Sequence, residues 1–120
     1  MSSPAAPPAP RPARMALTGP QIVAKLAQTP DWRLSGDGED LAIEKTFRFA
    51  SYLHTLSFVN AVAFLAEQHD HHPDMLVGYR SCSVRWRSHD VKGISARDFE
   101  CAVLVDALSG ESTQSGPHLG

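Results

Sequence analysis

The stretch LAIEKTFRF, residues 41–49, decides the fold of this chain. Its odd positions are mostly apolar, its even positions hold alanine, glutamate, threonine and arginine, and this period of two is typical of a strand with one apolar face. A shorter strand is predicted at residues 32–34, just before the turn-forming sequence Gly36-Asp37-Gly38. These two strands should therefore pair as a hairpin.

A helix is expected on each side of this hairpin. Thr18 and Gln21 form a capping-box pattern, and the first helix should end before Pro30. Ser51 is a suitable cap for a second helix over residues 52–67. The apolar residues of this second helix cover an arc wider than the roughly 100° that packing on one sheet requires. Either deep burial on two sides or a subunit interface would explain the width, and the pattern does not decide between them.

A second hairpin and a last helix follow. Residues 76–79 and 83–88 have the composition of strands. Ser95 and Asp98 form another capping-box pattern, for a helix that should run to about Leu108. The predicted order is helix, two strands, helix, two strands, helix. This order indicates an α+β domain, with helices packed on one face of a four-stranded antiparallel sheet.

Composition and charge narrow the class of protein. The chain has 120 residues, of which 42% are hydrophobic and 20% charged, as in a soluble globular protein with one domain. Its formal net charge is −2, so a nucleic-acid surface is not favoured, and its longest apolar run is far too short to span a membrane. Cys82 and Cys101 should be reduced, buried thiols in a cytoplasmic protein, with a disulfide or a reactive thiol as the alternatives.

Both ends of the chain have the composition of disordered tails. Residues 1–17 are rich in proline and alanine and should be disordered, because such a segment buries too little apolar surface. A transit peptide is the rival interpretation, since the segment carries arginines and no acidic residue. Residues 109–120 are polar and glycine-rich and are also expected to be disordered. The predicted domain therefore comprises residues 18–108.

The chemistry-bearing residues gather around His71-His72-Pro73 and His89. Histidine titrates near neutral pH, with an unperturbed pKa of about 6.5, and can act as an acid or as a base. Adjacent imidazoles in an extended segment point in different directions and rarely bind one ion, and no helical His-x-x-x-His pair is present, so a metal site is not favoured. Solvent-exposed loop histidines and acid–base catalysis on a small uncharged substrate both stay open at this point.

The spacing of these residues resembles that of a known protein family. The pattern Glu67-(three)-His71-His72-Pro73-(five)-Tyr79-(nine)-His89-(eight)-Asp98 resembles the signature of the pterin-4a-carbinolamine dehydratases. The resemblance implies dehydration of 4a-hydroxytetrahydrobiopterin to quinonoid dihydropterin, which recycles the cofactor of aromatic amino acid hydroxylases. It also implies no metal and no cofactor, because the pterin is the substrate.

The resemblance further assigns roles to individual residues. His71, His72 and His89 match the catalytic histidines, although which gives and which accepts the proton is left open. A second set should bind or orient the substrate: Glu67, Pro73, Met75, Ser88 and Asp98. Near Met75 the family often has an aromatic residue against the pterin. Methionine can still lie on a ring through its polarisable sulfur.

Partners also follow from the resemblance. A homodimer or homotetramer is implied, with an aromatic amino acid hydroxylase as a partner in pterin recycling and with no nucleic acid or membrane involved. The alternative function is a non-catalytic interaction protein on the same fold, either a dimerisation cofactor of a transcription factor or an assembly chaperone. All three motif histidines are present in this chain, which favours the enzyme.

Overall fold

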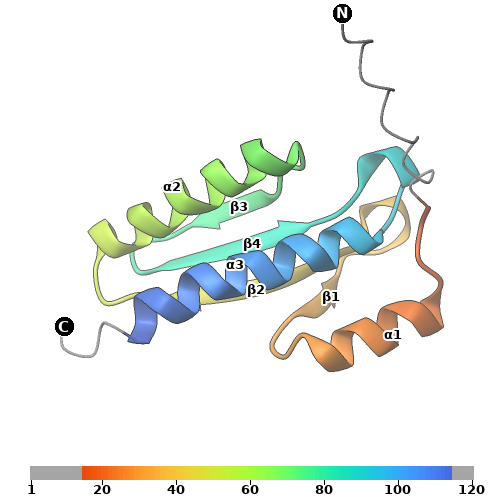
Figure 1. Cartoon of the computed structure of the whole chain (residues 1–120), viewed down its shortest axis with the longest axis horizontal. Helices are drawn as coiled ribbons and strands as arrows, with labels where there is room; N and C mark the ends of the chain where they lie inside the picture. The colour runs from red at the N-terminus through yellow and green to blue at the C-terminus, as the bar shows by residue number, and fades with distance from the viewer. Residues whose placement is uncertain (1–14, 115–120) are drawn as a thin grey trace, which may run out of the picture.

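The computed structural model describes residues 15–114, with side chains to residue 109. The four strands form one antiparallel sheet in the order β1-β2-β4-β3, and Figure 1 shows α2 and α3 lying across it. The elements are α1 (Gly19–Gln28), β1 (Arg33–Ser35), η1 (Gly38–Asp40), β2 (Ala42–Arg48), α2 (Tyr52–His69), β3 (Asp74–Val77), β4 (Ser81–Trp86), η2 (His89–Val91) and α3 (Ala96–Gln114). The predicted α+β fold class is confirmed.

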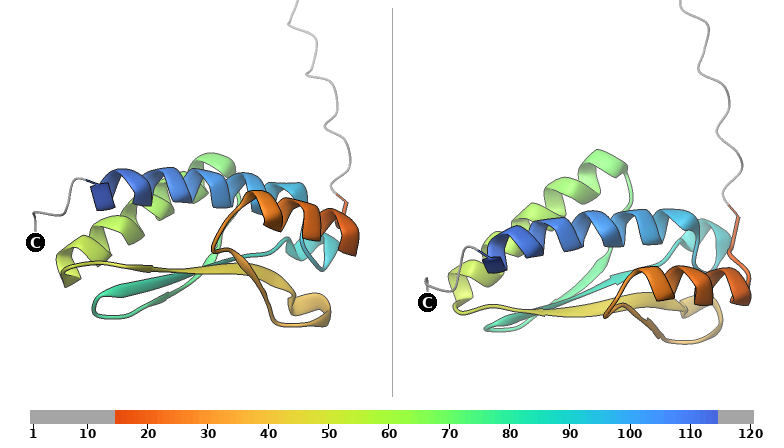
Figure 2. Two further views of the ribbon diagram at one scale, coloured as in Figure 1. Left: turned by 90° about the horizontal axis from the view of Figure 1, so that it is seen from below. Right: turned by 60° about the horizontal axis from the view of Figure 1, so that its bottom comes forward.

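All three α-helices lie on the same side of the sheet (Figure 2). The period-two pattern of β2 accounts for this arrangement, because Ile43 and Phe47 point to the helix-covered face and are buried. In the register of the sheet, Ile43 lies opposite Trp86 and Phe47 opposite Cys82. Val62 of α2 completes the same core cluster. The helices thus bury one face of the sheet, and no helix within residues 15–114 covers the other face.

One charged residue, Lys45, lies on this apolar face of β2. Its Nζ is 2.7 Å from Oδ1 of Asp106 on α3 and 4.9 Å from the centre of the Phe47 ring. The other oxygen of Asp106 accepts a hydrogen bond from Nε1 of Trp32 at 3.0 Å. Asp106 therefore joins α3 both to the central strand and to the segment between α1 and β1.

The second hairpin begins earlier than predicted. Strands were expected at 76–79 and 83–88, whereas β3 and β4 each start two residues before those positions, at Asp74 and Ser81. The turn explains the shift, because Gly78 N–H donates to Ser81 O at 2.7 Å and leaves Tyr79 outside the strand. At its far end β4 stops at Trp86, and Ser88 forms an isolated bridge with Gly93 instead.

The ends of the domain also differ from the expectation. The last helix was predicted to end near Leu108, before a disordered tail from 109, but α3 continues to Gln114. At the other end, Leu17 packs against the core and its N–H donates to Ile94 O at 2.8 Å, so the ordered chain starts before residue 18. The rest of the predicted tails, residues 1–14 and 115–120, lies outside the described part.

The wide apolar arc of α2 is buried on one side only. Phe58, Val62 and Leu65 face the core, whereas Leu53 and Phe64 are 72% and 73% exposed. Burial on two sides within one chain therefore does not explain the arc. Within the described residues, no helix is long and apolar enough to cross a membrane.

Candidate active site

The turn after α2 separates the two adjacent histidines. Asp70 caps the helix in the left-handed conformation, with φ 47°, a region that aspartate tolerates better than most residues. The N–H of His71 then reaches back to Ala66 O at 3.1 Å. After this turn the ring of His71 is buried, with 6% of the residue exposed, and that of His72 faces solvent.

The buried histidine contacts a buried carboxylate. Nε2 of His71 lies 2.6 Å from Oδ1 of Asp98, and Asp98 is fully buried at the first turn of α3. The imidazole also stacks on Trp86, with ring centres 5.3 Å apart and planes inclined by 15°. The hydrogen bond and the stack together fix both the rotation and the plane of the ring.

Asp98 occupies this place because of the capping box read from the sequence. Its Oδ2 accepts the backbone N–H of Ser95 at 2.8 Å, which is one half of the predicted box. The same oxygen accepts the hydroxyl of Ser88 at 2.9 Å, and the hydroxyls of Ser88 and Ser95 are 2.7 Å apart. A carboxylate at the start of a helix is also favoured by the helix dipole. The residue that caps α3 is thus also the partner of a histidine from the segment after α2.

The exposed histidine forms a separate pair. Nε2 of His72 is 2.9 Å from Oε2 of Glu67, and the side chains are 58% and 76% exposed, respectively. Glu67 lies on the last turn of α2, so the pair bridges the helix end and the following segment. A side-chain contact this exposed adds little stability, but it leaves both side chains accessible to a bound molecule.

The remaining predicted residues have distinct positions. His89 directly follows the predicted strand 83–88, and in the structure it is the exposed first residue of η2. In the described part of the chain no hydrogen bond connects His89 to His71 or His72. Pro73 is half-buried between α2 and β3, and Met75 is half-buried against the core on the helix-covered face of β3.

The structure thus brings together part of the predicted set. His71, Ser88 and Asp98 share one buried network, and His72 and Glu67 form an exposed pair beside it in the chain. Two participants were missed by sequence reasoning as site residues, namely Ser95 and Trp86. The signal for Ser95 was the capping box, which was interpreted only locally, and the inward register of Trp86 indicated no more than core packing.

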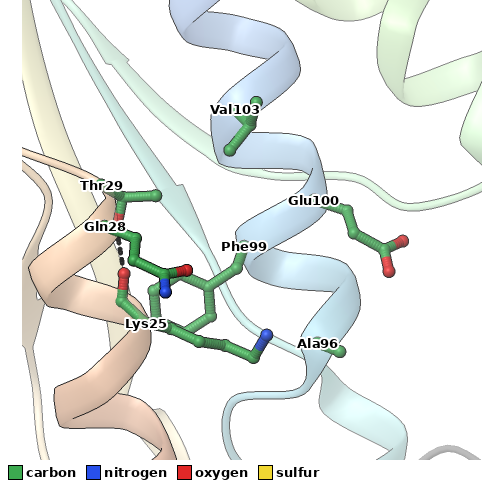
Figure 3. A pocket seen from close by; sticks show the side chains of 7 residues that line it. All are labelled: Lys25, Gln28, Thr29, Ala96, Phe99, Glu100 and Val103. Carbon is green, nitrogen blue, oxygen red and sulfur yellow. Dashed lines mark hydrogen bonds between the residues drawn. The ribbon is translucent and has the colours of Figure 1, made fainter.

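Other candidate sites offer less chemistry. Among the described residues, no group of three histidine, cysteine or acidic side chains is arranged to hold a metal ion. A depression of about 200 Å³ lies between α1 and α3 (Figure 3), and it contains none of the predicted site residues. Its lining consists of Lys25, Gln28, Thr29, Ala96, Phe99, Glu100 and Val103.

Known proteins resemble this chain over the whole domain. A relative from Paracidovorax citrulli, provisionally named a pterin-4-alpha-carbinolamine dehydratase, is 58% identical over 100 residues, which cover 83% of this chain and 86% of the relative. A protein from Stenotrophomonas maltophilia with the same provisional name is 48% identical over 89 residues, covering 74% of this chain and 75% of that protein.

Solved structures show the same arrangement. A transcriptional coactivator/pterin dehydratase from Brucella melitensis superposes with a TM-score of 0.73 at 26% identity, covering 78% of this chain and 98% of that one. A pterin dehydratase-like protein, identified as a RuBisCO assembly factor in the alpha-carboxysome, gives a TM-score of 0.57 at 28% identity, covering 67% and 90%. Residues 15–108 match the family model for pterin 4 alpha carbinolamine dehydratase. The chain therefore belongs to the pterin-4-alpha-carbinolamine dehydratase family.

Proposed function

We propose that this protein dehydrates 4a-hydroxytetrahydrobiopterin to quinonoid dihydropterin and water. The observation that carries the proposal is the buried hydrogen bond between His71 and Asp98, next to a solvent-facing His72. A histidine held by a carboxylate can take up or release a proton without losing its orientation. Family membership supplies the substrate class, and the provisionally named relatives carry the same activity in their names.

The reaction needs one proton delivered and one removed. In the carbinolamine a hydroxyl and a nitrogen share carbon 4a. When an acid protonates the hydroxyl, water leaves with the C–O electron pair and the nitrogen lone pair forms a C=N double bond. A base then removes one proton from the ring system, and the product is neutral. We assign these two steps to His71, His72 and His89, with no metal or cofactor.

Glu67 and Asp98 orient the histidines in this proposal. Glu67 Oε2 lies within hydrogen-bonding distance of His72 Nε2, as Asp98 Oδ1 does of His71 Nε2. Ser88 acts through Asp98, and Pro73 shapes the segment that carries both histidines. Met75, on the neighbouring strand, takes the place where the family often uses an aromatic side chain, and we assign it a contact with the pterin ring.

The test is a turnover assay on synthetic 4a-hydroxytetrahydropterin, followed by the absorbance of the quinonoid product. His72→Ala should remove most activity, on the order of 10²-fold, and should leave the fold intact because the side chain is largely exposed. His54→Ala is the matched control, since His54 is an exposed histidine of α2 outside the motif. Unchanged turnover in His72→Ala would refute its catalytic assignment.

The proposal includes the setting in which the enzyme works. The product is a pterin that a reductase can return to the tetrahydro form used by aromatic amino acid hydroxylases, so such a hydroxylase is the proposed metabolic partner. The buried, free thiol of Cys82 fits a reducing compartment, and we place the protein in the cytoplasm.

We also propose that the protein forms a homodimer or homotetramer. The edge strand β3 exposes Leu76 by 76%, and Phe64 on the neighbouring helix α2 is 73% exposed. An unpaired edge strand with exposed apolar residues favours pairing with another copy. Light scattering at micromolar concentration should give a mass of at least two chains, and Leu76→Lys should lower it. A monomeric wild-type protein would contradict this part of the proposal.

A non-catalytic assembly role is the second candidate. The observation in its favour is the structural similarity to a RuBisCO assembly factor, together with the same exposed apolar residues. A dimerisation cofactor of a transcription factor belongs to the same class of function. Complete lack of turnover by the wild-type protein, with the fold intact, would favour this candidate over the enzyme.

A further inference from the structure

We propose that Nδ1 of His71 is the atom that exchanges the proton with the substrate, and that Ser88 and Asp98 are positioning residues that fix this choice. The inference deepens the proposed function and rests on it. The hydrogen-bond donors around Asp98 leave few ways to distribute the protons between Asp98, Ser88 and His71. Each ring nitrogen of a neutral histidine is either a donor or an acceptor, and the partner of one nitrogen sets the state of the other.

Oδ2 of Asp98 receives two hydrogen bonds. This oxygen accepts the backbone N–H of Ser95 at 2.8 Å, and a backbone N–H cannot reverse its role. It also accepts the hydroxyl proton of Ser88 at 2.9 Å. With two donors directed at it, Oδ2 is an acceptor and carries no proton.

The hydroxyls of Ser88 and Ser95 donate in one direction only. Since the single proton of Ser88 Oγ points to Asp98, the 2.7 Å contact between the two hydroxyls requires Ser95 Oγ to donate to Ser88 Oγ. Ser95 Oγ in turn accepts the backbone N–H of Arg97 at 3.3 Å. The chain of donors therefore runs in one direction, from the first turn of α3 through Ser95 and Ser88 to the carboxylate.

The other oxygen of Asp98 is hydrogen-bonded to His71. Oδ1 of Asp98 is 2.6 Å from Nε2, and one of these two atoms must hold the proton between them. Imidazole is ordinarily the stronger base, and hydrogen bonds donated to the carboxylate favour its charged form. Nε2 of His71 therefore carries the hydrogen, and Nδ1 has the free lone pair.

The free nitrogen also retains some exposure to solvent. Within the described residues, the fully buried side-chain polar atoms that lack a partner are Nε1 of Trp86 and Nε of Arg87. Nδ1 of His71 forms no hydrogen bond there and is not one of these atoms, so it is not sealed from solvent. The stack on Trp86 holds the ring plane, and Nδ1 thus has a fixed direction.

The proton balance is the same in either direction of transfer. As a base, Nδ1 accepts the proton released from the pterin ring, and the resulting imidazolium faces the Asp98 carboxylate. As an acid, the imidazolium gives its Nδ1 proton to the departing hydroxyl, which leaves as water, and returns to the Nε2–H form. In both cases Nε2 keeps its hydrogen bond to Asp98 throughout.

Nitrogen NMR of the ¹⁵N-histidine-labelled protein tests the inference directly. The wild-type spectrum should show His71 with a protonated Nε2 and an unprotonated Nδ1. In Asp98→Asn the amide oxygen should remain with the donors of Ser88 and Ser95, so the NH₂ group faces Nε2. The tautomer should then invert to Nδ1–H, and kcat should fall by about 10²–10⁴-fold.

Ser88→Ala gives a second readout. Loss of the hydroxyl donor should lower kcat roughly tenfold and leave KM unchanged, because one hydrogen bond to a charged acceptor is lost. Ser51→Ala is the matched control, since it also removes a serine hydroxyl, one that accepts His54 N–H at 3.1 Å and lies outside the Asp98 network. Its kcat should equal that of the wild type.

The outcomes separate the two proposals. An active wild-type enzyme with the proton of His71 on Nδ1 would overturn this inference and leave the proposed function standing. An inactive protein with the expected spectrum would refute the proposed function, and the role of Nδ1 in the reaction would fall with it. If Asp98→Asn does not fold, the wild-type spectrum and the kcat of Ser88→Ala still decide the matter.

Discussion

Two neighbouring residues of one chemical type should differ widely in their effect on stability. His71→Ala removes the donor to Oδ1 of the fully buried Asp98, and it removes the ring stacked on Trp86. His72→Ala removes only an exposed contact with Glu67. Because the side chains are adjacent, the two variants share the same backbone segment, and they differ in what each ring contacts.

The expected losses in the free energy of unfolding follow from these contacts. A buried charged acceptor left without its donor costs about 1.5–3 kcal/mol. The lost ring stack adds about 0.5–1.5 kcal/mol. For His71→Ala the free energy of unfolding should therefore fall by about 2–4 kcal/mol, which lowers Tm by roughly 10–25 °C in a domain of this size. An exposed pair is worth about 0–1 kcal/mol, so His72→Ala should stay within roughly 5 °C of the wild type.

Urea and thermal denaturation followed by circular dichroism at pH 7 measure both variants. The m-value should be unchanged, so that the shift in midpoint reports stability alone. Asn at position 71 keeps a short side chain with an NH₂ donor, and His71→Asn should recover part of the loss. Equal losses for His71→Ala and His72→Ala would refute the reasoning, because they would mean that the contact with Asp98 contributes no stability.

Two further predictions concern groups outside the site. Asp106→Ala should lower the free energy of unfolding by about 1.5–3 kcal/mol in urea, because Lys45 and Trp32 lose a shared acceptor, and should leave kcat unchanged. Burial raises the pKa of Cys82 from 9.0 to about 11, so its thiol should resist an aromatic disulfide reagent at pH 8 until the protein unfolds. Ionisation of Cys82 then favours the unfolded chain, so Tm should fall as pH rises from about 9 through 11, and Cys82→Ala should weaken this dependence.

Local signals in the sequence predicted much of the fold. The capping box of Thr18 and Gln21 forms as expected, with both reciprocal hydrogen bonds present, and Ser51 caps α2. The alternation in β2 placed Ile43 and Phe47 on one face, where both are buried. These features depend on residues a few positions apart, which is why their spacing alone was informative.

Features that depend on distant partners were not predictable in the same way. Lys45 lies on the same face of β2 as the apolar residues, and no residue near it in the sequence shows that its partner is Asp106 on the last helix. The end of β4 was also predicted too late, at residue 88, whereas the ladder stops at Trp86. The alternation shows which face of the sheet a residue lies on, but the length of a strand depends on the strand beside it. Trp86 of β4 pairs with Ile43 of β2, and β2 begins at Ala42.

In the candidate site too, contacts between residues close in the sequence were predictable and contacts between distant residues were not. Asp98 was recognisable as a cap, and its spacing to the histidines suggested a role in the site, but only the packing of α2 against α3 brings it to His71. Its burial explains why the two roles coincide. A carboxylate without water needs several donors, and the helix start, Ser88 and His71 together supply them.

The exposed histidines of the site are not fixed by buried contacts as His71 is. His72 and His89 are exposed, and neither is held by a buried partner in the described part of the chain. Ordering such side chains costs conformational entropy, and a bound substrate with groups to contact would have to supply that free energy. We therefore expect Asp98→Asn to act mainly on kcat, through a histidine that is fixed before binding. His72→Ala should raise KM as well as lower kcat, and a pure kcat effect for His72→Ala would show that its position is also set before the substrate arrives.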